Sequence, residues 1–127
     1  MGKDQGELKM GRVKLNRRFN KPNIEEVIRE EDVEMLFDVD AYQKYGFELN
    51  HLYGLWVADQ ALVIIRSGQS RKEEDVTIAH EWGHVIEEYC CSFKSTEKQI
   101  EDQAYNIRKK KPHLVQFIRS FYRKEGF

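Results

Sequence analysis

The sequence predicts a single α+β domain over residues 1–127, in which a small, mostly antiparallel sheet packs on helices. Extended segments gather before residue 66, and segments with helical spacing and capping residues fill the second half, so the two kinds do not alternate. With 127 residues, of which 40% are hydrophobic and 34% charged, the chain has the composition of one soluble globular domain with a modest core.

The first predicted elements are a short strand and a helix. Residues 8–15 alternate loosely between apolar and polar side chains, which favours a strand. Asn23 is expected to cap a helix, and Glu26 follows three residues later, as in capping sequences. That helix is predicted to bury Ile24, Val27, Ile28, Met35 and Leu36.

The rest of the sheet is predicted between residues 47 and 66. Residues 47–52 read as extended, and 55–58 and 61–66 as two further strands. The pair Asp59-Gln60 between the last two is short enough for a tight hairpin, although it lacks the usual glycine. Residues 61–66 are a candidate exposed edge.

A long helix is predicted from Ser70 to about Phe93. Ser70 and Glu73 form an S-x-x-E capping box at its start. Its apolar residues cover more than half of the circumference, so the helix should be largely buried. His80 and His84 lie on the remaining polar strip, where lysine, glutamate and arginine are more usual.

Two further helices are predicted at the carboxyl end. Thr96 and Gln99 form a T-x-x-Q capping box for a helix over residues 97–110, which ends before Pro112. Its inner face carries the small residue Ala104, which would let helices approach closely. The last helix is expected from residue 112 or 113 to about 124.

The most informative segment is His80-Glu81-Trp82-Gly83-His84, an H-E-x-x-H motif. Positions i and i+4 of a helix share one face, so both imidazoles can reach one tetrahedral Zn²⁺ at about 2.0–2.1 Å. The carboxylate of Glu81 would lie near the same opening and could take a proton from the water that the metal activates.

A catalytic zinc usually has three protein ligands, and the sequence leaves the third one open. Glu101, on the next helix, can approach the histidines from across a groove, and Glu97 lies one turn before it. Glu87 is far along the histidines' own helix, and Cys90 faces the core if that helix is continuous. His51 precedes the hairpin and is more typical of a turn residue.

Composition argues against a membrane protein and against a secreted one. The longest apolar run, residues 61–65, is too short to span a bilayer, and the first residues lack the apolar core of a signal peptide. The two cysteines, Cys90 and Cys91, are adjacent and make a poor disulfide framework, which suits a reducing compartment. A cytoplasmic location is therefore expected.

Charge is segregated along the chain although the formal net charge is only −1. Residues 3–21 are mainly basic, residues 25–40 strongly acidic, and residues 108–111 basic again. A basic run without a recognition motif is more typical of a solvated helix end, so direct nucleic-acid binding is not expected.

Residues 54–65 (GLWVADQALVII) and 76–84 (VTIAHEWGH) resemble the ImmA/IrrE-like metallopeptidases, in which a hairpin precedes a helix bearing T-x-A-H-E-x-G-H. The resemblance implies a zincin-like fold of the gluzincin type, whose third ligand is a glutamate in a following E-x-x-A pattern. Residues 101–104 (EDQA) match that pattern, which implies Zn²⁺ held by His80, His84 and Glu101, with Glu81 as general base. The family usually has Asn or Asp where Tyr105 stands. Minimal gluzincins are a second resemblance, in size and motif.

Two functions of different classes follow. The first is a zinc metallopeptidase acting on a protein or peptide, and the resemblance implies regulatory proteins such as DNA-bound repressors. The second is a non-hydrolytic or latent domain that keeps the same fold and binds a partner. Glu81 favours the enzyme, because a structural metal site has no use for a general base.

Overall fold

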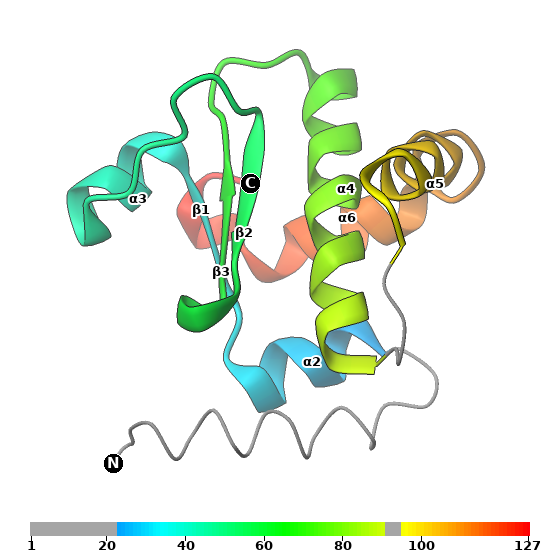
Figure 1. Ribbon diagram of the computed structural model, residues 1–127, viewed down its shortest axis with the longest axis horizontal. Coiled ribbons are helices and arrows are strands. Elements are labelled where there is room, and N and C mark those ends of the chain that lie inside the picture. The colour runs from blue at the N-terminus through cyan, green and yellow to red at the C-terminus, as the bar shows by residue number, and fades with distance from the viewer. Residues whose placement is uncertain (1–22, 91–94) are drawn as a thin grey trace.

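Within residues 23–90 and 95–127, which the computed structural model describes, helices and a small sheet form an α+β fold (Figure 1). The strand predicted over residues 8–15 and the basic run at residues 3–21 lie outside these ranges. The elements are α2 (Ile24–Glu31), β1 (Glu34–Phe37), α3 (Asp38–Tyr45), β2 (Gly54–Val57), the 3₁₀ turn η1 (Ala58–Gln60), β3 (Leu62–Ile65), α4 (Arg71–Cys90), α5 (Glu97–Lys110), α6 (Pro112–Phe121) and η2 (Arg123–Glu125).

The sheet is mixed, and the expectation of a mostly antiparallel sheet was wrong. Its order is β1-β3-β2, with β3 parallel to β1 and antiparallel to β2. The parallel pair arises because α3 and β2 lie between β1 and β3 in the chain, so β3 runs beside β1 in the same direction. The expectation that residues 61–66 form an exposed edge was also wrong, since β3 is central and β2 is an edge strand.

Strand β1 replaces part of the predicted first helix. Asn23 caps α2 as expected, accepting a hydrogen bond of 3.1 Å from the Glu26 amide. The helix nevertheless ends at Glu31, because Asp32 adopts a left-handed conformation with φ 54°. Met35 and Leu36 are 0% and 2% exposed and belong to two different core clusters. Their side chains therefore point in opposite directions, as successive side chains of a strand do.

The predicted hairpin is confirmed, whereas the strand predicted over residues 47–52 is not regular structure. The hairpin turn is the 3₁₀ element η1, followed by Ala61 at φ 50°, and its chain reversal pairs Val57 with Leu62. Residues 46–53 instead form a connection that buries Leu49 against the sheet. This connection also forms one wall of the site described below.

Strand β3 lies between the two parts of the core, and all four of its residues are buried. Val63 and Ile65 point to the main cluster, where they meet side chains of α4 and α6. Leu62 and Ile64 point to a smaller cluster that α3 helps to form. Burial on both faces explains why β3 is continuously apolar.

The helices of the second half begin as predicted. The Ser70–Glu73 and Thr96–Gln99 capping boxes both form, and α5 covers residues 97–110. Helix α6 ends at Phe121, earlier than expected, because the chain tightens into η2. Helix α4 lies between the sheet and α5 (Figure 1), and both neighbours contact it. No helix of the described ranges is long and apolar enough to cross a membrane.

Candidate metal centre

Two packing contacts fix the helix that carries the H-E-x-x-H motif. At its start, the side chain of Arg119 on α6 pairs with Glu74 at 2.6 Å and with Asp75 at 2.7 Å. Further along, the indole nitrogen of Trp82 donates to the sulfur of Met35 at 3.4 Å, which ties α4 to β1. The histidines of the motif are therefore presented from an element that is held against the core on two sides.

His80 and His84 meet carboxylates of α5. Nε2 of His80 lies 3.1 Å from one oxygen of Glu97, and Nε2 of His84 lies 3.2 Å from the other oxygen. Ligand atoms of these three residues all lie within 4.8 Å of one another. The two imidazole rings are 5.1 Å apart between centroids. A small cation placed among these atoms would face two nitrogens and one carboxylate.

Glu101 occupies the other side of the first histidine. Its carboxylate lies 2.6 Å from Nδ1 of His80, as in sites where a carboxylate orients a metal-binding imidazole through its second nitrogen. Its role as the third ligand, which the family resemblance implies, stays a prediction. The geometry brings Glu97, the alternative that the sequence left open, to the Nε2 atoms of both histidines.

The first turn of α5 sets the position of Glu97. The side chain of Thr96 accepts from the Gln99 amide at 3.1 Å, and the Gln99 side chain accepts from the Thr96 amide at 2.8 Å. Glu97 is thus the first helical residue, where a negative charge suits the helix dipole. Ala104, fully buried as predicted, helps α5 to pack closely on α4.

Glu81 lies at the wall of a cleft beside these groups and is only 7% exposed. Burial raises the pKa of Glu81 to about 7; the charge of His80 opposes this increase, and Glu97 and Glu101 add to it. A carboxyl group with a pKa near neutrality can both accept and return a proton at physiological pH. The position and the pKa therefore suit proton transfer.

The cleft has a volume of about 750 Å³ and opens between the start of β2, one face of α4 and α5. Gly54 begins β2 where a Cβ atom would come within 2.7 Å of Thr77 Cγ2 and 2.9 Å of Glu81 Cγ. The missing side chain lets the edge strand approach the helix. The cleft is lined by Leu52, Tyr53, Gly54, Gln69, Ser70, Lys72, Glu73, Val76, Thr77, His80, Glu81, His84, Glu97, Glu101 and Tyr105.

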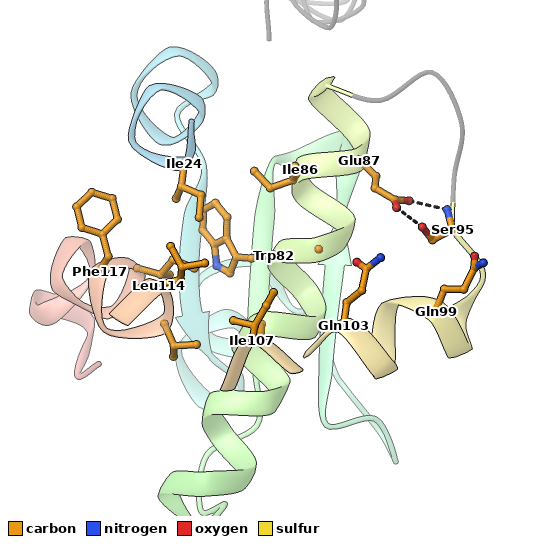
Figure 2. A pocket seen from close by; sticks show the side chains of 14 residues that line it. Ile24, Trp82, Ile86, Glu87, Ser95, Gln99, Gln103, Ile107, Leu114 and Phe117 are labelled. Carbon is orange, nitrogen blue, oxygen red and sulfur yellow. Dashed lines mark hydrogen bonds between the residues drawn. The ribbon is translucent and has the colours of Figure 1, made fainter. Parts of the chain in front are cut away.

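The other ligand candidates lie away from the centre. Glu87 accepts hydrogen bonds from the backbone and hydroxyl of Ser95 and lines a separate apolar pocket of about 670 Å³ between α4, α5 and α6 (Figure 2). His51 is exposed and is not among the residues that line the cleft. The side chain of Cys90 and all of Cys91 fall outside the described part of the chain.

Two cleft residues were missed as functional candidates. Tyr53 lies between two segments that the sequence predicts to be extended, residues 47–52 and 55–58, and Tyr105 stands out in the sequence only as a departure from a family pattern. Both are exposed aromatic side chains, at 65% and 56%. Glu97, Glu101 and Tyr105 follow one another at intervals of four positions, which is a signal that these residues share one helix face.

Comparison of this chain with protein-family models, with curated proteins and with solved structures finds no match. The resemblance to the ImmA/IrrE-like peptidases and the zincin-like fold therefore stay predictions. The assignment of the site depends on the chemistry and geometry of its residues.

Proposed function

We propose that the protein is a zinc-dependent peptidase that hydrolyses peptide bonds of extended protein or peptide segments. His80 and His84 are the histidine ligands, Glu97 is the third ligand and Glu81 is the general base. The observation that carries the proposal is the cluster of two imidazoles four residues apart with a carboxylate from another helix reaching both. The donor set of two histidines and one glutamate matches that of known catalytic zinc sites.

Each protein group has a defined task in this proposal. Glu101 accepts a hydrogen bond from Nδ1 of His80 and so keeps the lone pair of Nε2 available for a metal. When bound, zinc would polarise the substrate carbonyl and lower the pKa of its water to about 7. Glu81 takes the proton of the attacking water and delivers it to the departing amine.

The edge of the sheet offers a way to hold the substrate. In the described ranges β2 pairs with β3 alone, so its other edge can accept an added peptide strand. The close contact between Gly54 and Glu81 places the beginning of this strand next to the general base. Main-chain hydrogen bonds to β2 would hold an extended segment along the cleft.

The decisive experiment compares zinc-loaded wild type with Glu81→Gln on a reduced, alkylated protein, with new chain ends detected by mass spectrometry. The substitution is nearly isosteric and removes no ligand, so fold and metal content should be unchanged. Cleavage should fall by about 10²–10⁴-fold, the usual contribution of general acid–base catalysis.

His80→Ala is the matched contrast, because it removes a ligand and should lose metal together with activity. Equal cleavage by wild type and Glu81→Gln would assign the activity to another source. Absence of cleavage in both, with zinc bound, would favour the latent or partner-binding domain instead.

A further inference from the structure

Large apolar side chains are exposed on both walls of the cleft. Seven large hydrophobic side chains of the described residues are exposed, and three of them, Leu52, Tyr53 and Tyr105, line this one cavity. Leu52 and Tyr53 come from the connection before β2, and Tyr105 comes from α5. Helix α4 contacts both β2 and α5 and lies between them (Figure 1), and side chains from both of these neighbours line the cleft beside the metal centre.

The first wall is held in place by Arg66. Its guanidinium donates to the carbonyl of Leu52 at 2.8 Å and also to the carbonyl of Asn50, and it lies 5.8 Å from the centre of the Tyr53 ring. The backbone amide of Arg66 donates to the carbonyl of Tyr53 at 2.9 Å. These contacts fix the tyrosine backbone and support one face of its ring although the residue is 65% exposed.

The second wall is part of a rigid helix. Tyr105 follows Glu101 by four residues, so it lies one turn further along the same face of α5. Tyr105 therefore lies next to Glu101 of the metal centre, and it lines the cleft. Between the two walls, Val76 of α4 supplies a nearly buried apolar surface.

We propose that the cleft selects peptide segments with a large aromatic or aliphatic side chain near the scissile bond, and that Tyr53 and Tyr105 bind this side chain. This inference rests on the proposed peptidase function, which supplies the bond that is cleaved. A peptide paired to β2 would pass over Gly54 and present alternate side chains to the cleft floor at intervals of about 6.6 Å. An apolar side chain there would remove both tyrosine rings and Val76 from water.

Binding can be measured without catalysis, in zinc-loaded Glu81→Gln. The probes are two fluorescein-labelled nine-residue peptides of Gly, Ser and Ala that differ only in a central Phe or Ala. We expect the Phe peptide to bind about tenfold more tightly in fluorescence polarisation, as burial of an aromatic side chain in a partly open site would give. Tyr53→Ala or Tyr105→Ala should reduce this preference to less than about twofold.

Tyr42→Ala on α3 is the matched control, because Tyr42 is 56% exposed like Tyr105 but does not line the cleft. It should leave the preference unchanged, and Tyr53→Phe and Tyr105→Phe should retain it because they keep the ring. Circular dichroism checks that each variant is folded. Equal binding of both probes, or an equal effect of Tyr42→Ala and Tyr105→Ala, would overturn the proposal.

A second readout separates this inference from the peptidase function. Zinc-loaded wild type is given a proteome-derived peptide library, and residues beside the cleavage sites are counted. Enrichment of Phe, Tyr, Leu or Trp supports both ideas. Preferential binding of the Phe probe without cleavage would support the apolar subsite and contradict the peptidase function. Cleavage without a preference for these residues would support the peptidase function and contradict the apolar subsite.

Discussion

Glu101 lies 2.6 Å from Nδ1 of His80, so a proton on that nitrogen can be shared with the carboxylate while Nε2 keeps its lone pair. The same Nε2 faces Glu97 at 3.1 Å. Two glutamates of one helix thus meet the two nitrogens of one ring. In the proposed site the two carboxylates have different tasks, and metal binding can distinguish them.

Glu97→Ala should weaken zinc binding by more than about 100-fold, because it removes the third ligand of the proposed site. Glu101→Ala should weaken zinc binding only about 10–100-fold, as expected for loss of an orienting partner. Glu101→Gln should recover part of the lost affinity, because its amide oxygen can accept the same hydrogen bond. Competition with a chromogenic chelator gives the affinities. Asp102→Ala is the control, since it removes an α5 carboxylate that pairs with Lys98. A larger loss for Glu101→Ala than for Glu97→Ala would support the ligand set that the family resemblance implies.

Gly54→Ala should reduce both stability and cleavage. The new Cβ would lie 2.7 Å from Thr77 Cγ2 and 2.9 Å from Glu81 Cγ, so the strand or these two side chains must shift. Overpacking of this kind costs about 1–3 kcal/mol, which urea unfolding measures. Gly83→Ala is the contrast in stability: its Cβ would meet Ile100 at 3.4 Å, and alanine favours the helix. Equal destabilisation by both substitutions would contradict the close approach of β2.

Arg119→Met should destabilise the fold by about 3 kcal/mol, because it leaves the carboxylates of Glu74 and Asp75 without their buried partner. Urea unfolding at neutral pH measures the loss. Arg29→Met is the matched control, since the Arg29–Glu25 pair is exposed and should contribute less than about 1 kcal/mol. If the two losses are similar, Arg119 does not anchor α4 to α6.

Glu81 should make the metal-free protein less stable as the pH rises. Its pKa in the fold is about 7, above the ordinary value of 4.5, so the folded state holds the proton more tightly than the unfolded chain. Its stabilising contribution is fully present below pH 4.5 and is lost as the pH rises toward and through 7. The loss should be on the order of 3 kcal/mol.

The measurement is urea unfolding of the chelator-treated protein at pH values between 4.5 and 8, beside Glu81→Gln. The difference in unfolding free energy between the two proteins should change by the predicted amount over this interval. A constant difference would mean that the carboxyl group of Glu81 keeps an ordinary pKa in the fold.

The local sequence determined the elements whose signals lie within a few residues. Ser70 with Glu73 and Thr96 with Gln99 fixed the beginnings of α4 and α5, since a capping box is complete in four residues. The interval between His80 and His84 placed both imidazoles on one helix face. The hairpin of β2 and β3 was visible for the same reason, because its two strands are separated only by a short turn.

Tertiary structure decided the features that depend on partners distant in the chain. Met35 and Leu36 suited either a helix or a strand until pairing with Val63 and Ile64 buried them on opposite faces of the sheet. The parallel pairing of β1 with β3, which makes β3 central and leaves β2 at one edge, likewise joins segments almost 30 residues apart. The sequence left both Glu97 and Glu101 open as ligands, and the family resemblance favoured Glu101. Only the packing of α5 on α4 determined which imidazole nitrogen each carboxylate reaches, because one helical turn moves a side chain by about 5.4 Å.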